Sequence, residues 1–210
     1  MSTIRIADFL SDSNLDSNLS IDNPTKNDSV YLSKVSYKGK NLIFQTSKVI
    51  IEATDTDTLQ IKDNEELNNF LKIFDKKMIN TISKNSHDWF SKELSTSKVS
   101  QIYKSCKIHD LNTEENKYLF KLNEEVKVYG RNKEPMTIDD ISVNSNVILL
   151  VRLDYLVFYK TTCVPYFEVL HVKVKEPKPP SVEYSFREEE PDEQSDVIKI
   201  PLKLDELNFN

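Results

Sequence analysis

The sequence predicts an α+β fold: a small β-barrel or curved antiparallel sheet with one helical insert at about residues 64–107. Strand-like runs occupy both halves of the middle region, one long amphipathic run separates them, and the two ends of the chain are polar and acidic. We therefore expect a flexible polar arm over residues 1–28, a domain over residues 29–178 and an acidic tail over residues 179–210.

The charge of the chain is divided unevenly among these parts. The whole chain has 28 basic and 34 acidic groups, a net charge of −6. Residues 1–28 have 2 basic and 5 acidic groups, residues 29–178 have 23 and 20, and residues 179–210 have 3 and 9. The predicted domain is mildly basic, so the overall pI of about 5.2 does not indicate what it binds.

The composition excludes several classes of function. With only two glycines, Gly39 and Gly130, the chain cannot form a glycine-rich nucleotide loop or a G-x-S-x-G nucleophile turn. Its longest apolar run, Val147–Val151, is too short to cross a membrane, and the N-terminus lacks the pattern of a signal peptide. Two cysteines make no disulfide framework, so we expect a cytoplasmic protein without a membrane partner.

The first half of the domain begins with strands and continues with helices. Residues 30–37 and 41–45 read as two strands joined by the two-residue turn Lys38-Gly39, and residues 49–51 and 58–61 are shorter strand candidates. A helix follows, with Asp63 or Asn64 as its cap. One face of this helix carries apolar residues at spacings of three and four: Leu67, Phe70, Leu71, Phe74, Met78 and Ile82. Shorter helices are predicted over residues 87–94 and 97–107.

The second half of the domain is rich in strands. Four runs predict them: residues 118–123, 126–131, 147–159 and 166–174. In the second run, alternation puts Lys127, Tyr129 and Arg131 on one face of the strand and Val126 and Val128 on the other. The sequence thus predicts a strand face on which one ring lies between two cations.

Two short patterns raise the question of metal binding or catalysis. Cys106-x-x-His109 has the spacing of a zinc-ligand pair, but a zinc site usually needs two such pairs, and the alternative is a buried cysteine and a surface histidine. Asp139-Asp140 could serve as paired carboxylates, although such a pair more often caps a short helix or turn. We therefore expect no metal, no cofactor and no catalytic residues.

Aromatic residues stand next to basic residues at several points of the domain. Single nucleic-acid strands are bound by this combination, because rings stack on bases while cations follow the phosphates. The pattern predicts binding of single-stranded DNA, or RNA, by Tyr37, Lys38, Lys40, Lys127, Tyr129, Arg131, Tyr159 and Lys160. The alternative is that these tyrosines belong to ordinary strands and these lysines to their solvated face.

The order of motifs over residues 64–175 resembles that of a known family. A long helix is followed by Trp89-Phe90-Ser91-Lys92, by a strand pair, and by a closing strand pair over residues 146–174. This arrangement resembles the single-stranded-DNA-binding proteins of nucleocytoplasmic large DNA viruses and of yeast linear cytoplasmic plasmids. The chain departs from them at residues 161–167, where those proteins have a glycine near the start of the last strand and a tryptophan within it.

The resemblance implies an OB-like barrel that binds single-stranded DNA without sequence preference, during replication of a cytoplasmic virus or plasmid genome. By position, it implies a binding role for Trp89, Phe90 and Lys92 in the helical insert and for Arg152 and Tyr159 in the closing pair. The residue types of Trp89-Phe90 leave two roles open, which are a hydrophobic anchor for the insert and stacking on a base.

The predicted tail begins after the proline-rich run 176–180, which favours a stiff extended spacer. It is acidic and ends with the spaced apolar residues Leu204, Leu207 and Phe209. Such a tail can compete with DNA for the basic groove and, once displaced, recruit replication proteins. The alternative is a solubilising end.

The leading interpretation is a non-enzymatic single-stranded-DNA-binding protein that could form homo-oligomers. Two alternatives stay open: a viral or plasmid structural or assembly protein that binds protein partners, and a metal-dependent nuclease that uses Asp139 and Asp140.

Overall fold

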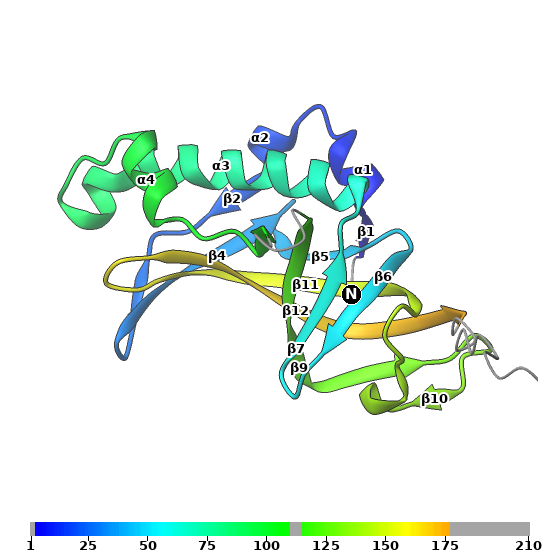
Figure 1. Ribbon diagram of the computed structural model, residues 1–210. Helices are drawn as coiled ribbons and strands as arrows, with labels where there is room; N and C mark the ends of the chain where they lie inside the picture. Colours follow the sequence, from blue (N-terminus) through cyan, green and yellow to red (C-terminus); the bar gives the residue numbers. More distant parts are fainter. Residues whose placement is uncertain (1–2, 110–114, 177–210) are drawn as a thin grey trace, which may run out of the picture. The chain divides into compact units, whose positions relative to one another are not determined.

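Strands are the most abundant secondary structure in a computed structural model, which describes residues 3–109 and 115–176 (Figure 1). The helices are α1 (Ile6–Leu10), α2 (Leu15–Asn18), α3 (Glu65–Phe90) and α4 (Thr96–Ile102), with a 3-10 turn, η1, at Ile138–Asp140. The strands are β1 (Ile4–Arg5), β2 (Leu19–Ile21), β3 (Thr25–Asn27), β4 (Val30–Tyr37), β5 (Lys40–Gln45), β6 (Val49–Thr54), β7 (Thr58–Lys62), β8 (Lys107–His109), β9 (Asn116–Tyr129), β10 (Pro135–Met136), β11 (Asn146–Phe158) and β12 (Cys163–Glu176). The long helix lies between two groups of strands in the sequence, as predicted.

Most of the strands pair in one sheet whose path closes on itself. The order is β1-β5-β4-β11-β12-β9-β7-β6, and β6 pairs again with β11. The register partners Val49–Val147 and Ile50–Asn146 make this return, so β11, β12, β9, β7 and β6 form a closed circuit. The 13 residues of β11 make the closure possible, because β11 pairs in succession with β6, β5 and β4.

Two pairings correct the expectation of an antiparallel sheet. Most pairs are antiparallel, but the short β1 runs parallel to β5, and β12 runs parallel to β9, with Glu168 opposite Lys121 and Lys173 opposite Tyr129. Parallel neighbours need a long connection, and here β10, η1 and β11 lie between β9 and β12 in the chain. A pairing of this kind leaves no local signal in the sequence.

The turn between β4 and β5 has the predicted chemistry. Lys38 and Gly39 both adopt positive φ, 52° and 70°, as a tight hairpin turn with the twist of its strands requires. Gly39 is suited to this conformation because it has no Cβ. The hairpin therefore forms at the residues that the sequence indicates.

The predicted amphipathic run forms α3. Its six apolar residues are all buried: Leu67, Phe70, Leu71, Phe74, Met78 and Ile82. The Asn64 side chain caps the helix by accepting the Leu67 backbone N–H at 3.0 Å. The Phe70 ring lies 4.7 Å from that of Phe44, and the Phe74 ring lies 5.5 Å from that of Phe167. α3 therefore packs with this face against the β5 and β12 side chains that form the core. Figure 1 shows α3 lying along one side of the strands.

The shorter helices differ from the prediction. Residues 87–90 are the last turn of α3, which ends where Ser91 takes the left-handed conformation, and α4 ends at Ile102. After α4 the chain is extended, because Tyr103 bridges to Cys163 and the Lys104 N–H donates to the Cys163 carbonyl at 2.8 Å. Pairing with β12 overrides the helical pattern of residues 103–107.

The N-terminal residues correct the expectation of a flexible arm. Within the described part of this segment, Ile6, Phe9 and Leu19 are buried. The Phe9 ring meets that of Phe70 of α3 edge-on, with centroids 4.9 Å apart, and β2 and β3 both pair with β4. Although this segment is polar, its few apolar residues hold it in place because they are all buried in the same core as α3.

The predicted acidic tail, with Leu204, Leu207 and Phe209, lies outside the described residues, so its roles stay predictions. Of the helices that the structure describes, none combines the length and the apolar character that crossing a membrane requires.

Candidate nucleic-acid interface

Three exposed tyrosines gather where β11 ends and β12 begins. Tyr155 and Tyr166 are register partners on these strands, and their side chains are 38% and 39% exposed. Tyr159 is 52% exposed and follows the end of β11. A register shift between Leu153 and Tyr155 produces this placement, because it changes which residues of β11 face solvent. We call Tyr155, Tyr159 and Tyr166 the tyrosine cluster.

A pocket of about 230 Å³ adjoins the tyrosine cluster. Tyr159, Tyr166 and Pro165 line one part of it, and Ile108 and Lys121 line another. The Lys121 ammonium is ion-paired with Asp57. Burial, and next the Glu168 carboxylate, raise the pKa of Tyr166, so its hydroxyl stays protonated and able to donate a hydrogen bond at neutral pH. Apolar walls and rings with a cation beside them suit a flat aromatic ligand.

Farther along β12, a second group of residues faces solvent on the same side as Tyr166. Phe167, Val169 and Val172 are buried, so Tyr166, His171 and Lys173 lie on the opposite side of the strand. Between Tyr166 and Lys173 the strand rises about 23 Å, at roughly 3.3 Å per residue. The face therefore has two ends, with the tyrosine cluster at one of them.

The far end carries the basic strand pair, which consists of Lys127, Tyr129, His171 and Lys173. His171 is the register partner of Lys127, and Lys173 that of Tyr129. The Tyr129 and His171 rings meet edge-on at 5.8 Å. Burial, and next the neighbouring Lys127, lower the pKa of His171, so its ring is neutral at pH 7. Within residues 3–109 and 115–176, neither Lys127 nor Lys173 forms an ion pair, so both are free to meet a phosphate.

The centre of the face holds one cation, Arg152, between two carboxylates. Arg152 forms an ion pair with Asp154 at 2.8 Å and donates a hydrogen bond to Glu168. Burial raises the pKa of Asp154, although the Arg152 charge opposes this shift. Arg152 would thus have to leave these carboxylates in order to hold a phosphate. The neighbouring strand β4 places a cation beside the tyrosine cluster. This cation is the exposed Lys34, which is the register partner of Tyr155.

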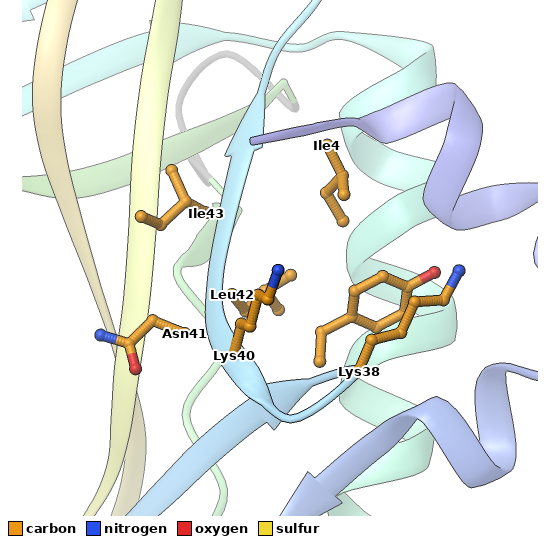
Figure 2. Close-up of a pocket in the computed structure, with 7 residues that line it drawn as sticks. Ile4, Lys38, Lys40, Asn41, Leu42 and Ile43 are labelled. Atoms are coloured by element: carbon orange, nitrogen blue, oxygen red, sulfur yellow. The ribbon is translucent and has the colours of Figure 1, made fainter. Parts of the chain in front are cut away.

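The predicted residues around the β4–β5 turn have a largely structural environment. Tyr37 is only 6% exposed, and its hydroxyl donates to Asp12, while Lys38 Nζ lies 3.5 Å from the same carboxylate. Lys40 is exposed. Lys38, Lys40 and Ile4 line a pocket of about 300 Å³ (Figure 2). Stacking of a base on Tyr37 would require its ring to leave the core, so the folded protein does not present this ring to a nucleic acid.

The predicted residues at the end of α3 lie away from the basic strand pair. The Trp89 and Phe90 rings both contact Phe158 of β11, at 6.2 and 5.4 Å, and Trp89 Nε1 donates to the Asn23 side chain at 2.9 Å. These contacts agree with an anchoring role for the insert. Lys92, Arg131 and Lys160 are all exposed and have no ion pair in the described part of the chain.

The two patterns considered for metal binding or catalysis are built into turns and strands. The Asp140 carboxylate accepts hydrogen bonds from the Thr137 N–H and hydroxyl, both at 2.8 Å, and these bonds lower its pKa. Asp140 therefore caps η1, which is the alternative role given above for the Asp139-Asp140 pair. Cys106 is buried and His109 is exposed on β8.

Sequence reasoning missed several residues of this face: Lys34, Tyr155, Tyr166, His171 and Lys173. Tyr155 and Tyr166 stand in the most hydrophobic runs of the chain, where a ring is ordinarily expected in the core. His171 and Lys173 do alternate with Val172 and Val174 in the sequence, and that signal could have found them.

Residues 30–188 match a protein family described as a family of unknown function, DUF5871. The chain belongs to this family. A search of curated proteins found no match to this DUF5871 chain.

Two solved structures of phage proteins are distantly similar to the DUF5871 chain. One is the single-stranded DNA-binding protein of bacteriophage Enc34 in complex with single-stranded DNA, with 12% identity and a TM-score of 0.42 over 76% of this chain and 98% of that chain. The other is gp2.5, a single-stranded DNA-binding protein encoded by bacteriophage T7, with 8% identity and a TM-score of 0.45 over 71% of this chain and 98% of that chain.

Proposed function

We propose that this protein is a non-enzymatic single-stranded-DNA-binding protein that lays the strand across the solvent-facing side of β9, β12 and β11. One observation carries the proposal: the exposed pair Tyr155 and Tyr166, on a strand that leads directly to the basic strand pair. Exposed rings on neighbouring strands are unusual without a partner, since each leaves a large apolar area in water.

The tyrosine cluster supplies the stacking contacts. Each base stacked on an aromatic side chain contributes roughly 1–3 kcal/mol, and every base has a face that can stack. Binding by this route therefore has little sequence preference. The pocket beside Tyr159 and Tyr166 takes one base that is turned away from the adjacent bases of the bound DNA.

The phosphates are met at the two ends of the face rather than at its centre. Lys34 lies beside the tyrosine cluster, and Lys127 and Lys173 belong to the basic strand pair. Arg152 is balanced by Asp154 and Glu168 and adds little attraction. With so few free cations, affinity depends on stacking as well as charge, and it falls as salt is raised.

The wider setting follows from the same proposal. The closed strand circuit with α3 against its core side is compatible with an OB-like barrel. The resemblance to proteins of nucleocytoplasmic large DNA viruses and yeast linear plasmids supports a role in replication of such a genome in the cytoplasm. Replication proteins would then bind the acidic tail through Leu204, Leu207 and Phe209, and several copies would coat one strand.

A titration with oligo-dT and with oligo-rU at two salt concentrations tests the function. We expect oligo-dT to quench tyrosine fluorescence and added salt to reverse the quenching. A structural or assembly protein would show no response to either strand. If Mg²⁺ led to degradation of the oligonucleotide, and Asp140→Asn stopped it, the nuclease alternative would replace the proposal.

A further inference from the structure

The outward side of α3 carries a line of basic and amide side chains. Asn69, Lys72, Lys76, Asn80 and Lys84 are all exposed and recur at spacings of three or four along the helix. We call Lys72, Lys76 and Lys84 the lysine stripe. At 1.5 Å per residue, it extends over about 18 Å of the helix.

No acidic side chain interrupts the lysine stripe within the helix. Between Glu66 and Asp88 the only acidic residue of α3 is Asp75, which is half-buried and accepts a hydrogen bond from the Tyr103 hydroxyl at 2.7 Å. Lys77, at the flank, is ion-paired with Asp16 of α2. In the described part of the chain, none of the three stripe lysines has an ion pair. The stripe is thus a positive surface on a chain whose net charge is −6.

The lysine stripe and the tyrosine cluster lie on opposite sides of the layer that β12 forms. Phe74 of α3 contacts Phe167, whereas Tyr166, the preceding residue on β12, points to the other side of the strand. The stripe in turn faces away from Phe74 on the helix. A strand bound on the tyrosine cluster would leave the stripe free.

We propose that the lysine stripe is a second surface for nucleic acid, one that binds the phosphate backbone of another segment of strand or of a duplex. Charge complementarity argues for a polyanion, and the length of the stripe corresponds to about five phosphates of one strand at 3.4 Å each. Asn69 and Asn80 add amide groups that donate to phosphate oxygens. Ile73, exposed between Lys72 and Lys76, is suited to the apolar edge of a sugar.

The test compares two double variants of the full chain that lose the same charge. Lys72→Gln/Lys76→Gln removes two stripe lysines, and Lys26→Gln/Lys48→Gln removes two exposed lysines elsewhere. Glutamine keeps the helical propensity of lysine, so α3 should stay folded, which a thermal melt checks. The probes are a duplex, which cannot stack on the tyrosine cluster, and a long oligo-dT.

We expect the stripe variant to lower the salt slope of binding by about 1.8 for the duplex if both lysines contact phosphates, or by about 1.4 for oligo-dT if the second segment is single-stranded. The stripe substitutions should lower the salt slope by the same amount in a protein that also carries Tyr155→Ala/Tyr166→Ala. This result would show that the lysine stripe binds independently of the proposed stacking site. Slopes that match those of the control variant would overturn the proposal. A rise in affinity in the stripe variant would also overturn it and would assign the stripe to an acidic peptide.

Discussion

Tyr155 of β11 and Tyr166 of β12 are register partners, and both rings are exposed to solvent. In a strand pair, directly opposed side chains point to the same face of the sheet and are about 4.5–5.5 Å apart at Cβ, so the two rings lie on one surface. Stacking on this surface gives the first prediction. Tyr155→Ala and Tyr166→Ala should each weaken binding of oligo-dT by about 1–3 kcal/mol, roughly 5- to 150-fold, in an anisotropy titration.

Tyr31→Ala is the matched control for this prediction. Tyr31 of β4 is 47% exposed, comparable to the two cluster tyrosines, but it lies opposite Phe158 rather than within the cluster. Its loss should leave affinity unchanged. An equal loss in all three variants would mean that exposed rings in general, and not this pair, set the affinity.

The basic strand pair gives a prediction about salt. Lys127→Gln/Lys173→Gln should reduce the salt slope for oligo-dT by about 1.4, since each lost phosphate contact on a single strand contributes about 0.7. The exposed Lys26→Gln/Lys48→Gln pair serves again as control. A variant with weaker binding but an unchanged slope would show that these lysines act through folding and not through phosphates.

The Asp12–Tyr37 contact predicts how stability depends on pH. The hydrogen bond from the Tyr37 hydroxyl, with those from Asn18 and Asn14, lowers the pKa of Asp12 far below its ordinary value near 4. A carboxylate with a lowered pKa in the folded state stabilises the fold above its unfolded pKa, and this stabilisation is lost as pH falls through the folded value.

Asp12→Asn should therefore lower the melting temperature at pH 7, and the difference from the unaltered chain should shrink as the pH is taken below 4. Tyr37→Phe should reproduce part of this loss because it removes the first of these bonds. Thermal melts from pH 7 to pH 3 measure both. A difference that is the same at every pH would show that ionisation of Asp12 has no part in the effect.

The two cysteines should be inert in the folded protein. Both are buried, and burial raises the pKa of Cys163 to about 12. Only about one molecule in ten thousand then carries the reactive thiolate at pH 8. Modification by a disulfide reagent should be more than about 100-fold slower in the native state than in denaturant, where both thiols react. Fast reaction of one thiol in the native protein would place that cysteine near the surface.

The acidic tail gives the last prediction. Truncation after Lys178 removes a segment with 3 basic and 9 acidic groups. If this segment competes with DNA for the basic residues, its removal should tighten binding of oligo-dT and change the salt slope. Unchanged affinity would reduce the tail to a spacer.

Local chemistry explains which elements could be predicted. The face of α3 follows from six apolar residues at helical spacing, Leu67 to Ile82, and the β4–β5 turn follows from Lys38-Gly39, where glycine accepts a positive φ. These signals depend on residues a few positions apart, so they can be read in the chain before it folds. The exposed Lys127 and buried Val128 follow from strand alternation in the same way.

The candidate site depended on contacts between distant segments. A shift in the pairing of β11 with β12 exposes Tyr155, and the parallel pairing of β12 with β9 sets Lys173 opposite Tyr129. The docked N-terminal residues bring Asp12 to Tyr37 and withdraw that ring from solvent. The amino-acid sequence by itself determined the long helix α3, the β4–β5 hairpin and the supply of rings and cations. Only the tertiary structure decided which of them meet solvent, because exposure and ion pairing depend on neighbours from elsewhere in the chain.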